Sequence, residues 1–257
     1  MRHKVLIRAT LMIGDASAVV CDRSAVAWHG LDTLSRPPAA VHVRVPAASG
    51  GRSNHLVVRS FGEPPAHLRQ DHGGIAVVTP AVAAVEMACS ASFREAVVVC
   101  DSALRAGTSA QELMAALGAI AGRTGSAAAA RAVAFADGRA GSAGESLSRV
   151  VLREIGLDAE DLQTRVRDDR GLAGITDFSW LSHRTVGEFD GRVKYGRDGP
   201  NAESRDVLWR EKQREDRLRA RGLEVVRWTW ADLDQPEEIA RRIRAAWRRA
   251  AQRVPAA

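Results

Sequence analysis

The sequence predicts an α+β protein with two domains, and three observations support this fold class. Helix and strand signals are mixed along the whole chain of 257 residues, a length that suits one large domain or two small ones. A stretch rich in Gly, Ala and Ser at 138–144 is typical of a linker. After it, the signals run helix, three strands, helix, strand, helix. We therefore expect a small α+β domain over 1–137, a linker over 138–144, and a second domain over 145–257.

Turn and cap residues set the elements expected in the first domain. Two helical pieces are expected between Leu11 and Gly30, and Pro37-Pro38 then breaks the chain. A strand is expected where apolar residues alternate at 41–45, and further strands are expected at 54–61 and 74–78. Thr79 and Pro80 then open a helical region. Its four helices are expected at about 80–89, at 93–105, from the Ser109–Glu112 capping box to 121, and at 123–136.

The second domain begins with a capping box from Ser142 to Glu145, which opens a helix that Gly156 ends. The remaining elements expected are a strand at 162–166, a pair of strands within 174–194, a helix at 202–221, a strand at 223–230 and a helix at 237–253. The mixed charges of the helix at 202–221 are usually just a solvated face. The last helix has acids at its start and arginines at its end, which matches the helix dipole.

Carboxylates gather in the stretch from Gly174 to Lys194, which reads as two short strands joined by a polar turn. Because side chains alternate along a strand, Glu188 and Asp190 share a face of the second strand, and Asp177 of the first can converge on them in a hairpin. Three such carboxylates repel one another, which favours proton uptake or a bound cation. Mg²⁺, or Mn²⁺, is the natural ion. Lys194 could reach back to a phosphate or to an attacking water.

Purely structural roles explain these acidic residues about as well as a metal site does. Carboxylates at a sheet edge often serve only to discourage edge pairing, and Asp190-Gly191 could be a simple turn. Glu145 could cap its helix, could add a fourth carboxylate to the strand site, or could do both.

Composition limits the class of protein. The apolar and charged fractions are those of a globular chain, and the formal net charge of +6 comes from arginine, which favours polyanion partners. The richness in arginine and alanine also matches a high-GC bacterial coding bias, so the charge alone is weak evidence for such a partner. The three cysteines form no CxxC pair, which argues for a reducing cytoplasm and against structural zinc. No apolar run reaches membrane-spanning length, and the N-terminus lacks a signal-peptide cleavage site.

The second domain resembles the PD-(D/E)XK nuclease superfamily, whose core is an αβββαβ unit, and more narrowly the bacterial domains related to the very-short-patch-repair (Vsr) endonuclease. The motifs that carry this resemblance are Glu145-Ser146, Asp177-Phe178 and Glu188-Phe189-Asp190-Gly191. The later helix and strand motifs fall on Glu211, Arg214, Leu218, Gly222, Val225, Arg227 and Trp230. Two positions depart from the pattern: Asp190 stands where the superfamily has lysine, and Lys194 stands where the related domains have histidine.

The first domain resembles the middle region of AbiEi-family proteins, which are antitoxin-type transcriptional regulators of type IV toxin–antitoxin systems. The resemblance covers about 10–137 and is carried by DRSAVAWHGL, VHVRVP and VVTPAVAAVEMACSASFREAVVVCDSALRAG. Family members usually begin with a winged helix-turn-helix, and the chain before Leu11 is too short for one. The scattered histidines of this half are expected to be surface or packed residues, and no catalytic constellation is expected there.

Two functions follow from these resemblances. The first is a cytoplasmic Mg²⁺-dependent DNA endonuclease in which Asp177 and Glu188 hold the metal, Asp190 adds a carboxylate, Glu145 assists and Lys194 orients the water. Its DNA backbone contacts would come from Arg241, Arg242, Arg244, Arg248 and Arg249. The alternative is a non-enzymatic regulator or antitoxin with a relic nuclease fold, which binds DNA or a toxin-type protein.

Overall fold

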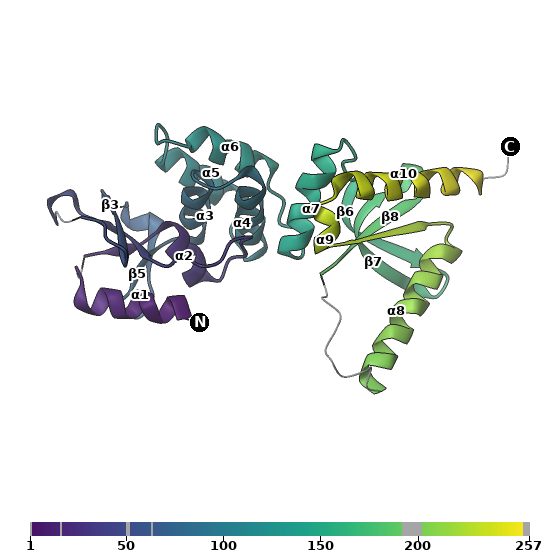
Figure 1. Ribbon diagram of the computed structural model, residues 1–257, viewed down its shortest axis with the longest axis horizontal. Coiled ribbons are helices and arrows are strands. Elements are labelled where there is room, and N and C mark those ends of the chain that lie inside the picture. The colour runs from purple at the N-terminus through teal and green to yellow at the C-terminus, as the bar shows by residue number, and fades with distance from the viewer. Residues whose placement is uncertain (1, 16, 50–51, 63, 192–201, 254–257) are drawn as a thin grey trace. The chain divides into compact units, whose positions relative to one another are not determined.

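The computed structural model describes residues 2–15, 17–49, 52–62, 64–191 and 202–253, with side chains in the last range described from residue 209 onward. The fold is α+β, as the sequence predicts, and the chain divides into two compact units, Met1–Gly138 and Arg139–Ala257 (Figure 1). This division falls at the start of the predicted linker. Each unit has its own sheet and its own buried core.

Unit 1 contains a small mixed sheet and a group of helices. Its helices are α1 (Arg2–Ile13), α2 (Asp22–His29), α3 (Pro80–Ala88), α4 (Phe93–Arg105), α5 (Ala110–Ala119) and α6 (Ser126–Phe135). Its strands are β1 (Val19–Val20), β2 (Val41–Val45), β3 (Val57–Phe61), β4 (Arg69–Asp71) and β5 (Ala76–Val78), in the spatial order β3-β2-β1-β5-β4. Helix α3 is buried over Ala81–Ala88 and contacts α2, α4, α5 and α6, so it forms the centre of the helical group (Figure 1).

Local signals place the α3–α5 region correctly. The Thr79 side chain accepts a hydrogen bond from the Val82 backbone N–H at the start of α3, and the capping box of Ser109 and Glu112 is present at α5. Helix α4 occupies the predicted residues. These starts are predictable because a cap depends only on neighbours in the sequence.

The start of unit 1 differs from the prediction of a helix at Leu11. Helix α1 instead ends at Ile13, and its buried face of His3 and Ile7 has the spacing of one helical turn. The next residues form β1, which pairs antiparallel with β2 and parallel with β5. The short strand β4 is a further element that the sequence analysis misses, and it pairs with β5.

Unit 2 has the element order expected from the sequence, with one short helix, α9 (Trp230–Leu233), added between the last strand and the last helix. Its elements are α7 (Ala143–Glu154), β6 (Asp161–Asp168), β7 (Gly171–Trp180), β8 (Thr185–Asp190), α8 (Ala202–Ala220), β9 (Glu224–Thr229), α9 (Trp230–Leu233) and α10 (Pro236–Gln252). The sheet order is β6-β7-β8-β9. Strands β6, β7 and β8 pair antiparallel, whereas β8 and β9 are parallel and are joined through α8, as a parallel pair requires.

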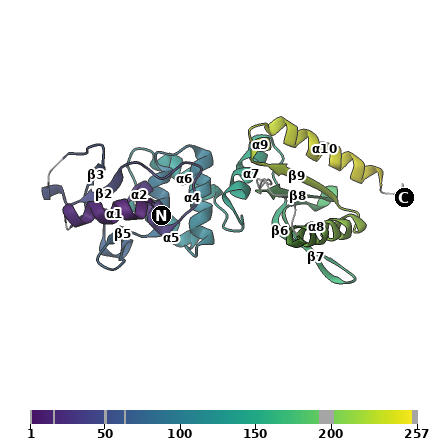
Figure 2. The ribbon, with the colours of Figure 1, turned by 60° about the horizontal axis from the view of Figure 1, so that its bottom comes forward.

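Helices cover both faces of the sheet of unit 2. On one face, the Trp228 indole N–H donates to Ser148 Oγ of α7 at 2.8 Å, and Trp180 meets Trp247 of α10 edge to face. On the other face, Leu218 of α8 packs with Ala173, Val186 and Leu223. Figures 1 and 2 show α10 and α8 on opposite sides of this sheet.

Across the described ranges, no helix combines the length and the apolar composition needed to cross a membrane.

Candidate active site

The predicted hairpin of β7 and β8 is confirmed, and it brings Asp177 and Glu188 together. The two strands pair with Phe178 opposite Gly187, and the same register continued by one residue sets Asp177 opposite Glu188. Asp177 Oδ2 accepts a hydrogen bond from the Phe189 backbone N–H at 2.8 Å. The carboxylate of Asp177 is therefore anchored to the neighbouring strand.

Glu145 reaches the same place from the first turn of α7. Ser142 caps this helix, and its side chain accepts from the Glu145 backbone N–H. The Glu145 carboxylate accepts from the Gly141 backbone N–H at 2.6 Å and from Ser142 Oγ at 2.9 Å. Glu145 thus fulfils its capping role and also lies close enough to Asp177 to affect its ionisation electrostatically.

Gln163 of β6 links the two carboxylates and is a site residue that the sequence analysis misses. Its Nε2 donates to Glu145 Oε2 at 2.9 Å and contacts Asp177 Oδ1 at 3.4 Å. The backbone of Gln163 has φ 51°, a left-handed conformation near the start of strand β6. No pattern in the sequence indicates this conformation, because it depends on the pairing of β6 with β7.

The charge balance at Asp177 is unfavourable to its ionised form. Burial and then the neighbouring carboxylates of Glu145 and Glu188 together raise the pKa of Asp177 to about 6, against the lowering effects of the Phe189 N–H and Gln163. A side chain with this pKa is poised between protonation and cation binding near neutral pH.

Glu188 is held differently, by two arginines. Its Oε1 accepts from Arg214 of α8 at 2.6 Å and its Oε2 accepts from Arg227 of β9 at 2.9 Å. Both arginines also pair with Glu211 of α8, and Arg227 pairs with Glu215 as well. The pKa of Arg214 is raised, chiefly by its hydrogen bonds to Glu211 and then by Glu188. Both oxygens of Glu188 are thus engaged, and its negative charge is balanced.

Of the two remaining predicted site residues, the structure describes Asp190 and does not describe Lys194. Asp190 is the half-buried last residue of β8, in register with Thr229 of β9. Lys194 lies outside the described residues, so its predicted role stays a prediction. Within the described residues, no group of three or more His, Cys, Asp or Glu side chains has an arrangement that could hold a metal ion.

A smaller donor set at Asp177 nevertheless has the right chemistry for Mg²⁺. Mg²⁺ is usually bound through one or two carboxylates, several waters and the phosphate of a substrate, rather than by a complete protein cage. Asp177 and Glu145 supply two hard oxygen donors on either side of one amide nitrogen. A cation there would offset the burial and the repulsion that raise the pKa of Asp177. The pair therefore fits such an ion, whereas Glu188 fits only if an arginine releases it.

The predicted DNA-binding arginines on α10 divide into two groups. Arg241 and Arg242 both pair with Glu238, and they lower the pKa of that carboxyl to about 2. Arg242 also pairs with Asp232 of α9, and Arg249 pairs with the buried Glu224. Within the described part of the chain, Arg244 and Arg248 form no ion pair and are exposed. Helix-internal and structural contacts therefore account for three of the five predicted residues.

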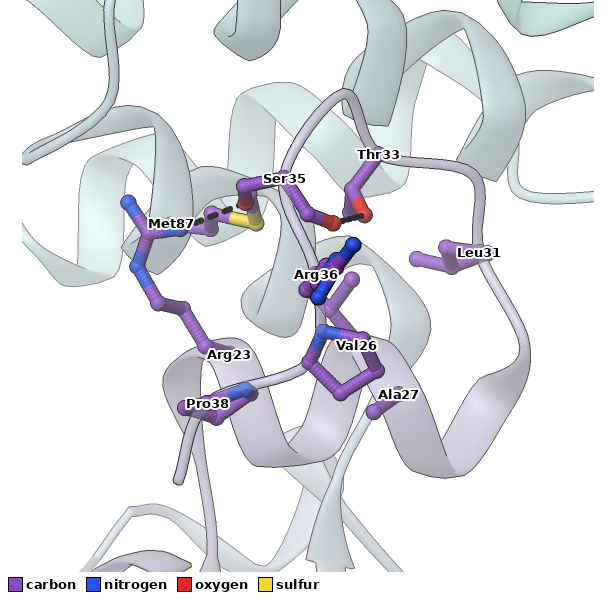
Figure 3. A pocket seen from close by; sticks show the side chains of 10 residues that line it. Arg23, Val26, Ala27, Leu31, Thr33, Ser35, Arg36, Pro38 and Met87 are labelled. Carbon is purple, nitrogen blue, oxygen red and sulfur yellow. Dashed lines mark hydrogen bonds between the residues drawn. The ribbon is translucent and has the colours of Figure 1, made fainter. Parts of the chain in front are cut away.

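Unit 1 contains a small cavity beside α2, shown in Figure 3, that is lined by Arg23, Arg36, Met87 and apolar side chains. Two hydrogen bonds link its polar groups: Arg23 donates to Ser35 Oγ at 3.1 Å, and Thr33 donates to the Ser35 carbonyl at 2.7 Å. These bonds hold the segment after α2 in place and give this part of the cavity a structural explanation.

Comparison with known proteins identifies similar proteins but indicates no activity for this chain. No family model matches it. Two uncharacterized proteins of Mycobacterium tuberculosis, MT2308 of strain CDC 1551 / Oshkosh and Rv2248 of strain H37Rv, are each 33% identical over 174 residues, or 67% of this chain. The match spans 62% of each relative, less than two thirds of its length. A crystal structure of the Rv2827c protein from the same species aligns with TM-score 0.38 and 16% identity, covering 64% of this chain and 61% of that one.

Proposed function

We propose that unit 2 is a Mg²⁺- or Mn²⁺-dependent endodeoxyribonuclease of the PD-(D/E)XK type, related to the Vsr-like domains, and that it acts in the cytoplasm. The observation that supports this proposal most strongly is the raised pKa of Asp177 beside Glu145 and Glu188. Burial and the neighbouring carboxylates make the ionised form of Asp177 costly. A cation shared by Asp177 and Glu145 would offset that cost.

In this proposal, Asp177 is the principal metal ligand and Glu145 is the second carboxylate. Glu188 and Asp190 are further acidic groups on β8. A divalent cation held there supplies Lewis acidity toward a water and toward a phosphate oxygen of the substrate. Lys194 would orient the attacking water or neutralise developing charge on the phosphate.

The surrounding residues keep the acids in position. The Phe189 backbone N–H fixes one oxygen of Asp177, and Gln163 spans Asp177 and Glu145. Arg214 of α8 and Arg227 of β9 each hold one oxygen of Glu188. These contacts restrict the side chains to one arrangement, which lowers the entropy cost of forming a reactive complex.

Two observations favour a second candidate, a non-enzymatic AbiEi-like regulator or antitoxin with a relic nuclease fold. Glu188 is neutralised by two arginines, and Asp190 occupies the position at which the superfamily has lysine. Such a protein would bind DNA or a toxin-type partner without cutting.

Plasmid nicking tests the choice between the two candidates. Supercoiled plasmid is incubated with the wild-type protein in Mg²⁺, in Mn²⁺ and in EDTA, and thermal melting is followed under the same conditions. The nuclease proposal predicts cation-dependent nicking that Asp177→Asn abolishes. The control variant Asp169→Asn, which changes an exposed aspartate in the β6–β7 turn, should keep the activity. If the wild type neither nicks DNA nor gains melting temperature with either ion, the regulator becomes the better candidate.

A further inference from the structure

Trp230 is an exposed aromatic residue at the edge of the acidic site. It is the first residue of α9 and follows directly on β9, where the parallel pairing of β8 and β9 ends with Asp190 opposite Thr229. Its side chain is 40% exposed, whereas Trp228 and Trp180 of the same sheet are 1% and 2% exposed. Figures 1 and 2 both show α9 next to α7, the helix whose first turn carries Glu145.

Phe189 contacts Trp230 with its ring and Asp177 with its backbone N–H, and so links the indole to the acidic site. The two rings meet at right angles with centroids 5.1 Å apart. The backbone N–H of Phe189 is the same group that binds Asp177 Oδ2 at 2.8 Å. On its other side, the Phe189 ring packs so closely on α7 that a Cβ placed at Gly144 would come within 1.9 Å of it. Trp230 therefore rests on a rigid support.

The contact with Phe189 leaves Trp230 40% exposed. An exposed indole beside a phosphate-directed site is suited to a flat, apolar and polarisable group of a ligand. In nucleic acids, that group is a base, and stacking on an aromatic side chain accepts any base because every base has a π face.

We propose that Trp230 stacks on an unpaired nucleobase next to the bond that is cut, so that the substrate is single-stranded or locally unpaired nucleic acid. This inference rests on the proposed function, because it takes the Asp177–Glu145 pair as the place of cleavage. In a fully paired duplex, both faces of each base are covered by neighbouring base pairs, so the indole has no partner there.

The charges on the neighbouring helix suit the same ligand. Helix α10 contacts α9, and Arg242 of α10 pairs with Asp232 of α9 at 2.8 Å. Arg241, Arg244 and Arg248 follow at intervals of three and four residues, so they lie on one exposed face over about 10 Å of helix. A strand whose base rests on Trp230 could place its phosphates along these cations.

Binding measurements on the full-length protein test the inference separately from cleavage. In EDTA, fluorescence anisotropy compares the affinity for a labelled duplex that has a short single-stranded gap with the affinity for the same duplex fully paired. The wild type should prefer the gapped duplex. Trp230→Ala should weaken binding to the gapped duplex by about 10-fold, the factor that corresponds to about 1.4 kcal/mol, and leave the paired duplex within about 2-fold.

Further variants separate stacking from packing. Trp230→Phe should retain most of the preference, whereas Trp230→Leu, which still covers Phe189, should lose it. Trp209→Ala removes another exposed tryptophan, 60% exposed on α8, and should change neither affinity. The inference is wrong if the wild type shows no preference for the gap, if Trp230→Ala weakens both complexes equally, or if leucine restores the preference. A Trp230-dependent preference without nicking would instead count against the nuclease proposal alone, and nicking without the preference would count against the inference alone.

Discussion

Replacing Asp177 by asparagine should stabilise the protein near neutral pH. The pKa of Asp177 is raised from 3.8 to about 6, by burial and then by Glu145 and Glu188. A rise of about 2 units, at about 1.4 kcal/mol per unit, means that the ionised side chain costs the folded state about 3 kcal/mol. Asparagine removes this charge and keeps an oxygen that can accept from the Phe189 N–H. We expect a gain of roughly 1–3 kcal/mol in the free energy of unfolding.

The size of this effect depends on pH in a defined way. Below pH 3.8, Asp177 is protonated in both the folded and the unfolded state, so it contributes no difference. Between 3.8 and about 6, the unfolded chain ionises first, and the stability of the wild type falls as the pH rises. The advantage of Asp177→Asn should therefore grow across this window and stay constant above it.

Urea denaturation followed by tryptophan fluorescence measures the effect. Five of the six tryptophans lie in unit 2, so the signal reports mainly on the unit that contains Asp177. The experiment compares wild type, Asp177→Asn and the exposed-site control Asp169→Asn from about pH 4 to pH 8, without divalent cations. The reasoning is refuted if Asp177→Asn is no more stable than the wild type at neutral pH, or if its advantage does not change with pH.

Three further predictions concern neighbouring features. Glu188→Gln should lower the free energy of unfolding by about 1–3 kcal/mol, because it removes the shared charge of two ion pairs, and a gain in urea denaturation would contradict this. Gly144→Ala should cost about 1–3 kcal/mol and slow cleavage, since its Cβ would displace the Phe189 ring; unchanged melting would contradict the packing. The salt dependence of duplex binding should have a log–log slope of about 0.9 per neutralised phosphate, and a triple alanine variant should flatten it. The residues changed are Arg241, Arg244 and Arg248.

The sequence allowed those elements to be predicted whose signals are local. The caps at Thr79, Ser109 and Ser142 mark helix starts because a side chain there binds a backbone group a few residues away. Strands β1 and β4 were missed because they have two and three residues, too few for alternation to appear, and exist through pairing with distant strands. Tertiary pairing, rather than local preference, determines such short strands.

The sequence allowed the acidic residues of the candidate site to be predicted, but not the side chains that bind them. Asp177 and Glu188 could be assigned to facing strands because a hairpin fixes which residues oppose each other. Gln163 could not be assigned, because its role depends on an unusual backbone conformation in β6. Arg214 was read as part of a solvated helix face, yet it reaches the sheet and binds Glu188. Its long side chain crosses between elements, and no spacing within one element indicates that contact.

The most direct test of the account is the pKa of Asp177 with and without Mg²⁺. A ¹³C NMR titration of its side-chain carboxyl carbon gives this value, with Asp177→Asn used to assign the signal. The account predicts a pKa near 6 without divalent cations and a clear decrease when Mg²⁺ is added, because a bound cation favours the ionised carboxylate. An ordinary aspartate pKa without cations, or a raised pKa that Mg²⁺ does not change, would contradict the account of Asp177 as a metal ligand.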